Sequence, residues 1–232
     1  GAMVLRQGAE VTDKPVAAVL NTHVHGDHWL GNHAIREAYP EVPIYGHPRM
    51  IAQVEQGAGE QWVGQMMRAT EGATAGTVPM GPNLEVSDGD EVTVGGLTFR
   101  FHHPGIAHTE TDVMIQVPES GVLFMADNAN NRRIVRMDDG RFTGNAEALD
   151  YALKIPAQIY VPGHGRTGDA QFVRDYRDYL AELYAAVEEL YDEGLAPYEM
   201  KPRIAERLAE YSDWVGFEDE LGKHISLAYL EV

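Results

Sequence analysis

Short apolar runs and alternating segments fill the first two thirds of the chain, and helical periodicity dominates the last third. Residues 16–21 form an apolar run after Pro15 that predicts a buried strand. Residues 31–39 predict a helix, and residues 42–45 predict a second strand that stops at Gly46. The chain therefore begins its predicted structure as strand, helix and strand.

A long segment with helical spacing follows, before the pattern returns to strands. Residues 49–70 carry apolar positions at helical spacing, and residues 71–83 are rich in Gly, Thr, Pro and Ala and predict a loop. Residues 91–94 and 97–102 alternate on either side of Gly95-Gly96, which is typical of a β-hairpin. We therefore expect an antiparallel strand pair directly after this helical segment and loop.

The rest of the chain completes an alternation of strands and helices. The predicted elements are strands at residues 112–117, 121–126 and 159–161, and helices at residues 169–192, 202–211 and 217–230. Strands in the middle with helices on both sides predict a layered α/β fold. We expect residues 1–232 to form a single domain, with residues 169–232 as its C-terminal helices.

Composition narrows the classes of partner. The net charge is −18, with 36 acidic and 18 basic residues, which argues against nucleic acid because phosphate binding needs a basic surface. No apolar run reaches the roughly 18 residues that a membrane-spanning helix needs. Cys is absent, so any metal must be held by His and carboxylate groups. This composition fits a periplasmic or a cytoplasmic location equally well.

The start of the chain indicates that the natural N-terminus is missing. Gly1-Ala2-Met3 is typical of a protease scar and cloning remnant. We therefore expect that any export signal has been removed, and the compartment stays open.

A cluster of metal-binding residue types follows the first predicted strand. His23, His25, Asp27 and His28 lie within six residues. Side chains alternate in an extended segment, so His23 and His25 point the same way. Gly26 allows a sharp turn that brings Asp27 and His28 toward a second metal. The spacing predicts a metal site for hydrolytic chemistry.

The pattern His-x-His-x-Asp-His at residues 23–28 resembles the signature of the metallo-β-lactamase superfamily, and later segments of that family follow in order. They are Pro-Gly-Ile-Ala-His-Thr at residues 104–109, Phe-Met-Ala-Asp at residues 124–127 and Val-Pro-Gly-His-Gly at residues 161–165. The resemblance implies that His23, His25 and His108 bind one zinc ion. It assigns Asp27, His28 and His164 to a second, with Asp127 bridging; other divalent metals stay open.

The resemblance also implies the family's αββα sandwich, with two departures from the pattern. Residues 49–88 form an insertion that we expect to shape the pocket. The strands that normally precede the His motif are absent, because about a dozen native residues come before residue 16. An exposed sheet edge would then be available, and we expect a homo-oligomer to form through it.

The resemblance implies a dinuclear zinc hydrolase that acts on a small molecule. A metal-bound hydroxide would attack a carbonyl-type substrate such as a β-lactam, lactone, thioester or other ester, or a sulfur or phosphorus centre, with Asp27 and Asp127 orienting it. Candidate substrate contacts are Asn128, Tyr160 and Arg166. Three alternatives stay open: a truncated or non-catalytic metal-binding fragment or interaction module, a redox di-iron protein, and a nuclease, which the charge disfavours.

Overall fold

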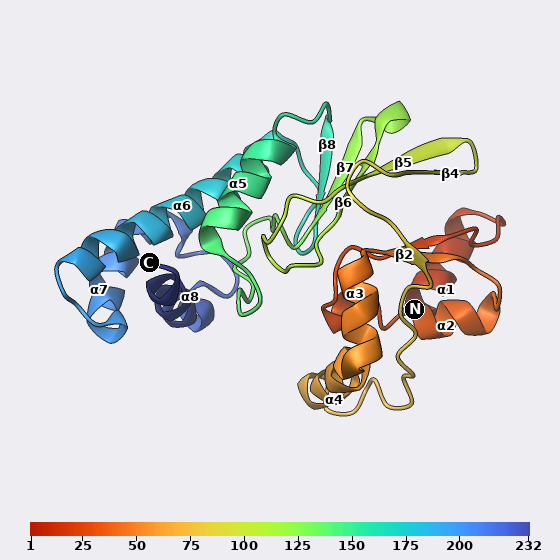
Figure 1. Cartoon of the computed structure of the whole chain (residues 1–232), viewed down its shortest axis with the longest axis horizontal. Coiled ribbons are helices and arrows are strands. Elements are labelled where there is room, and N and C mark those ends of the chain that lie inside the picture. The colour runs from red at the N-terminus through yellow and green to blue at the C-terminus, as the bar shows by residue number, and fades with distance from the viewer. The chain divides into compact units, whose positions relative to one another are not determined.

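The computed structural model describes residues 1–232 and has the α/β fold class that the sequence predicts (Figure 1). The chain divides into two compact units, Gly1–His103 and Pro104–Val232. Each unit has its own strands and helices, and each is described by itself below. A single domain over residues 1–232 stays a prediction.

The first unit contains a short parallel sheet. Its strands are β1 (Val19–Leu20), β2 (Ile44–Gly46) and β3 (Leu84–Glu85), in the order β1-β2-β3. Val19 pairs with Ile44 in β1–β2, and both contacts between neighbouring strands are parallel. The strands predicted at residues 16–21 and 42–45 are confirmed in place, and β1 is shorter than its apolar run. The sequence did not predict β3, because a strand of two residues is too short to produce a recognisable alternation.

Four helices accompany this sheet: α1 (Ala2–Val11), α2 (Asn32–Ala38), α3 (Pro48–Gln53) and α4 (Gly59–Ala69). A π-helical turn at Val54–Ala58, with Gly57 at φ 101°, joins α3 to α4. The helical segment predicted at residues 49–70 is therefore confirmed, with a kink that Gly tolerates because it has no side chain. No strand precedes Val19, and the pattern did not predict α1.

A β-hairpin ends the first unit, as the sequence predicts. Strand β4 (Glu91–Val94) pairs antiparallel with β5 (Leu97–His102), and Val94 lies opposite Leu97. Gly95 and Gly96 have φ values of 60° and 84°. Positive φ at both central residues is the requirement of a type I′ turn, which explains why two glycines stand here.

The second unit has strands β6 (Met114–Val117), β7 (Val122–Ala126) and β8 (Ile159–Pro162), which confirm the three predicted strands. Strands β6 and β7 are antiparallel, and β7 and β8 are parallel. The crossover from β7 to β8 contains helix α5 (Phe142–Ala152), which the sequence pattern did not predict. A parallel pair places the C-terminal ends of β7 and β8 at the same edge of the sheet.

Helices α6 (Ala170–Asp192), α7 (Pro197–Arg207) and α8 (Phe217–Glu231) complete the second unit. The helices predicted at residues 169–192 and 217–230 are confirmed. The helix predicted at residues 202–211 is wrong in its bounds, because it begins at Pro197 and a 3-10 turn occupies Ala209–Tyr211. Pro197 sits at the first helical turn, where its fixed φ and missing N–H suit a helix start.

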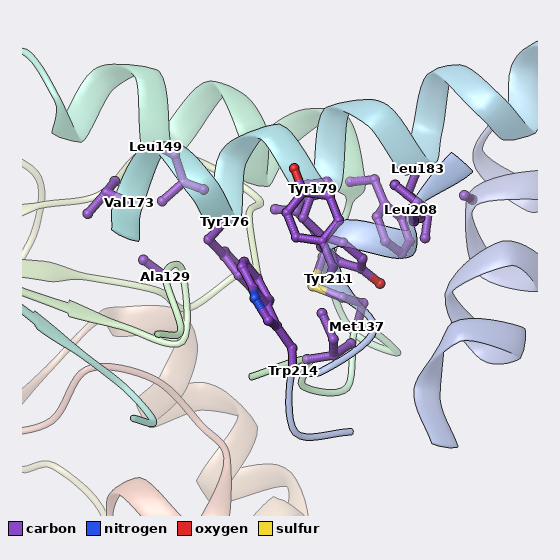
Figure 2. Packing of buried hydrophobic residues seen from close by; sticks show 14 of the residues in the cluster. Ala129, Met137, Leu149, Val173, Tyr176, Tyr179, Leu183, Leu208, Tyr211 and Trp214 are labelled. Carbon is purple, nitrogen blue, oxygen red and sulfur yellow. The ribbon is translucent and has the colours of Figure 1, made fainter. Parts of the chain in front are cut away.

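The main hydrophobic core of the second unit lies between α6 and its neighbours (Figure 2). Helix α6 contacts α5, α7 and α8, and its face with Tyr176, Tyr179 and Leu183 is fully buried. The Tyr176 ring stacks on Trp214 with centroids 6.3 Å apart and planes at 8°. Burial of several large aromatic side chains gives this unit a rigid base for the loops that carry functional residues.

Candidate metal centre

In the first unit, the His motif forms a tight loop directly after β1. Residues Gly26–His28 make a 3-10 turn, which gathers the four side chains. The centroid of the His23 ring lies 4.9 Å from that of His25 and 4.3 Å from that of His28. His28 Nε2 lies 3.3 Å from Asp27 Oδ2. His23 and His25 are buried and Asp27 is exposed, so the motif passes from the interior to the surface.

Buried hydrogen bonds fix this loop on its own unit. The Trp29 indole N–H donates to the carbonyl of Val24 at 2.6 Å. At the start of the loop, the buried amides of Asn21 and Asn32 donate to each other at 3.3 and 2.8 Å. Such a network holds a loop in one conformation, because breaking any bond would leave a buried polar group without a partner.

The His23 ring has a defined orientation. Its Nδ1 forms a hydrogen bond with Thr22 Oγ1 at 3.1 Å. With the proton on Nδ1 in this bond, Nε2 is the nitrogen that offers its lone pair to a metal. A hydrogen bond of this kind commonly sets both the tautomer and the direction of a histidine ligand.

The insertion at residues 49–88 contacts the loop of residues 23–28, which carries the His motif. The sequence led us to expect that the insertion shapes the pocket, but it did not indicate which residues make the contact. Trp62 of α4 lies against His25, with ring centroids 4.9 Å apart. A Cβ on Gly26 would lie 3.0 Å from Trp62 Cβ, so a side chain at this position would require Trp62 to shift. The insertion therefore supplies an aromatic wall beside a predicted metal ligand.

In the second unit, two histidines converge on one carboxylate. The nitrogen atoms His108 Nε2 and His164 Nε2 each lie 3.5 Å from Asp127 Oδ2. His108 and Asp127 are buried, and His164 is partly exposed. His108 lies in the loop before β6, Asp127 directly follows β7 and His164 lies just after β8, so the pairing of the strands brings the three residues together.

The donor set fits zinc. Zinc–nitrogen and zinc–oxygen bonds of about 2.0–2.2 Å in a tetrahedron place neighbouring ligand atoms roughly 3.3–3.5 Å apart. The two 3.5 Å separations at Asp127 match this spacing and exceed normal hydrogen-bond lengths. In the first unit, the ligand atoms of His23 and His25, and those of Asp27 and His28, lie within 4.8 Å of each other. Metal-binding residues are thus present in both units.

Two features of the backbone place Asp127. The register between β7 and β8 shifts after Phe124, and Ala126 has φ 49°, an uncommon value for a residue with a side chain. Gly163 donates its N–H to the Ala126 carbonyl at 2.7 Å. The end of β8 therefore lies directly against the end of β7.

A buried carboxyl group that sequence reasoning missed stabilises the loop of His108. Asp112 accepts hydrogen bonds from the Thr109 N–H at 2.6 Å and from the Thr109 hydroxyl at 2.8 Å. Burial raises the pKa of Asp112 to about 7, against the lowering effect of the Thr109 hydrogen bonds, and the charge of Asp127 raises it further. The Thr-x-Thr-Asp run after His108 was the available signal, because Thr and Asp side chains commonly bond nearby backbone.

The three predicted substrate contacts lie in different surroundings. Asn128 is buried and donates to the Met125 carbonyl at 3.2 Å, and Tyr160 belongs to the hydrophobic core. Arg166 is exposed, and its carbonyl accepts from Asn131 Nδ2 at 2.7 Å. Their role in binding substrate stays a prediction.

This chain combines an α/β fold with clusters of His and Asp side chains, which are residue types that bind metal ions. The chain belongs to the metallo-beta-lactamase superfamily, whose sequence profile matches residues 3–164. The matched residues include all seven predicted ligands. The family resemblance and the α/β fold class predicted from the sequence are therefore confirmed.

Two curated relatives are hydrolases. The chain is 24% identical to a linear primary-alkylsulfatase from Pseudomonas sp., across 91% of this chain and 47% of the relative. It is 25% identical to a hydroxyacylglutathione hydrolase from Gloeobacter violaceus, across 72% of this chain and 57% of the relative. The chain thus spans about half the length of the curated relatives it matches.

Solved structures share the fold. A stereoselective inverting sec-alkylsulfatase from Pseudomonas sp. aligns with a TM-score of 0.73 and 18% identity, across 99% of this chain and 43% of the other. A metallo-beta-lactamase from Pontibacter korlensis aligns with a TM-score of 0.62 and 17% identity, across 78% of this chain and 75% of the other.

Among the helices of this chain, none has the length and apolarity that crossing a bilayer requires.

Proposed function

We propose that the two ligand clusters bind one pair of zinc ions and that the protein hydrolyses ester-type bonds of a small molecule. His23, His25 and His108 would hold the first ion, Asp27, His28 and His164 would hold the second, and Asp127 would be a ligand to both. The observation that carries the proposal is the pair of 3.5 Å separations from Asp127 Oδ2 to the imidazole nitrogens of His108 and His164. One carboxylate that serves two histidines from different loops suits a bridging ligand.

When bound, a zinc pair supplies an activated water and polarises the bond that is cleaved. The protein's own groups then orient the reaction. Asp127 is buried and Asp27 is exposed, so the two carboxylates differ in their access to solvent. We assign to both the orientation of the attacking water, and to the more exposed Asp27 the exchange of its proton with solvent.

Trp62, the aromatic wall beside His25, also has a role in the proposed function. Trp62 lies against the His25 ring, and Trp29 is buried beneath the same loop. Apolar side chains beside a metal ligand exclude bulk water and strengthen electrostatic interactions within the site. Trp62 therefore contributes an apolar surface for the substrate next to the first ligand group.

Carbonyl-type compounds are the first candidate substrates, and they include β-lactams, lactones, thioesters and other esters. Alkyl sulfates are a second candidate class, since the two alkylsulfatase relatives align with 91% and 99% of this chain, and the hydroxyacylglutathione hydrolase aligns with 72%. Hydrolysis adds water across the bond that is cleaved: esters and thioesters give an acid and an alcohol or thiol, and a β-lactam opens to an acid and an amine. An alkyl sulfate gives hydrogen sulfate and an alcohol. We assign the same ligand set to both reactions.

A substrate panel with zinc-loaded protein tests the proposal. The panel contains a thioester, a lactone, a β-lactam and a linear alkyl sulfate, each assayed with and without zinc. Zinc-dependent turnover of at least one compound is the expected result. Zinc-loaded protein that turns over none of them would support the non-catalytic metal-binding module, and iron as the bound metal would support the redox alternative.

A further inference from the structure

Asn130 occupies the space between the two strand ends that carry Asp127 and His164, and its side chain is fully buried. Its Nδ2 donates to the Asp127 carbonyl at 3.0 Å. Its Oδ1 accepts the backbone N–H of His164 at 2.9 Å. One amide side chain therefore joins the backbones of two predicted ligands that are 37 positions apart in sequence.

Further hydrogen bonds join the loop after β7 to the loop after β8, and none of them uses the side chain of Asp127 or His164. The N–H of Asn131 donates to the His164 carbonyl at 3.0 Å, and Asn131 Nδ2 donates to the Arg166 carbonyl at 2.7 Å. The loop after β7 and the loop after β8 are therefore linked bond by bond. Within this series, Asn130 is the residue whose side chain bonds both ligand residues.

A buried tyrosine lies beside Asn130 at the edge of the core. Tyr176 is fully buried on α6, and burial raises the pKa of its hydroxyl while the neighbouring Asn130 side chain lowers it. The Tyr176 ring is held in turn by its stacking on Trp214 (Figure 2). The aromatic core thus lies next to Asn130, whose own bonds are to the loops of Asp127 and His164.

Resting on the proposed function, we infer that Asn130 is a positioning residue for the metal pair, which fixes the separation of Asp127 and His164 through their backbones. Asp127 Oδ2 and His164 Nε2 lie 3.5 Å apart in the structure. Residues that orient metal ligands through hydrogen bonds typically alter metal affinity about 10–100-fold when removed. Asn130 would act in this way from the backbone side of both ligands.

The test compares Asn130→Ala with Asn131→Ala, a matched control. Asn131 stands next in the chain, and its side chain bonds Arg166 and neither ligand residue. Zinc affinity is measured by competition with a chelator, and the cobalt-substituted proteins are compared by visible spectroscopy. Melting of the metal-free proteins reports folding separately.

We expect Asn130→Ala to lower zinc affinity about 10–100-fold and to change the cobalt spectrum, with Asn131→Ala within about twofold of the unaltered protein. If Asn130→Ala fails to fold, Asn130→Asp replaces it, because it keeps an acceptor for the His164 N–H and loses the donor to Asp127. If Asn130→Ala had the same zinc affinity and cobalt spectrum as Asn131→Ala, the role of Asn130 would be overturned and the proposed function would stand. An unaltered protein that binds no zinc would overturn the proposed function as well.

Discussion

Gly163 lies so close to Asp127 that a Cβ on Gly163 would be 1.8 Å from Asp127 Oδ1. Its φ is not in the left-handed region, so the need for glycine here comes from proximity and not from backbone conformation. Gly163, which directly follows β8, thus approaches the predicted bridging carboxylate closely enough to fix its position. This relationship lies within the second unit and does not depend on the first.

Gly163→Ala should displace Asp127 and weaken metal binding. The added methyl group must push away the carboxylate or the backbone of Ala126, and such overpacking costs about 1–3 kcal/mol. We expect zinc affinity to fall roughly 10–100-fold, as measured by chelator competition. Gly8→Ala is the control, since nothing lies within 4 Å of the added group. Equal affinity in the two variants would show that Asp127 is not held by Gly163.

His25→Ala should remove metal and activity together. His25 is buried beside His23 and Trp62, and its loss deletes one nitrogen from the proposed first zinc site. We expect a fall in zinc affinity of more than about 100-fold, because a ligand matters more than the residues that orient it. Metal content by elemental analysis and turnover of the best substrate are measured on the same sample.

The control for that variant is His33→Ala. His33 stands on α2 of the same unit, pairs with Glu37 at 3.7 Å and accepts the Val78 N–H, and it is outside the predicted ligand set. It should retain zinc and turnover. Full activity of His25→Ala without metal would contradict the proposed chemistry.

His224 should make the folded state sensitive to acid. It is buried on α8, where its Nδ1 bonds the Tyr179 hydroxyl and its Nε2 bonds the Val135 carbonyl. Burial lowers the pKa of His224 from 6.5 to about 4, although the Val135 hydrogen bond and the charges of Glu220 and Asp138 oppose this. The folded state therefore takes up this proton less readily than the unfolded chain.

This difference fixes the direction of the pH dependence. Between about pH 4 and pH 6.5 the unfolded chain holds the proton at this position and the folded state does not, so stability rises with pH in that window. Falling pH should cost about 3 kcal/mol from this group by pH 4. Urea unfolding of His224→Gln across the window should show a smaller loss than the unaltered protein. Equal losses in both proteins would remove His224 as the cause.

Oligomerisation through a sheet edge stays a prediction, and the structure defines where to test it. Strand β1 is the outer strand of the three-stranded sheet in the first unit, and Ala17 just before it is exposed. An outer strand offers backbone groups for pairing with another chain. We expect a dimer in light scattering at micromolar concentration and a monomer for Ala17→Lys. A monomer of the unaltered protein would contradict the expectation.

The sequence predicted those parts of the structure that depend on local pattern. The hairpin at Gly95-Gly96 and the helix of residues 169–192 follow from turn chemistry and apolar spacing, and both are confirmed. The ligand histidines stood out because four metal-binding side chains within six residues have few other uses. Local pattern was therefore enough for the fold class and for placing the candidate ligands of the first unit in one loop.

Features that depend on contacts between distant segments could not be predicted. Asn130 joins residues 127 and 164 only after β7 and β8 pair, and Asn130 in sequence is one of three similar asparagines. Helix α5 buries positions at helical spacing, but Phe142 and Leu149 are the large apolar side chains among them, so the pattern is weak in the sequence. The start of α7 was misplaced because Pro197 ends one helix pattern and also begins the next helix.

The zinc content of the purified protein, measured by elemental analysis after loading and removal of excess metal, tests the proposed two-zinc centre. We expect about two zinc ions per chain, with fewer in His25→Ala and the same number in His33→Ala. No bound zinc in the loaded protein, or the same zinc content in all three proteins, would contradict it.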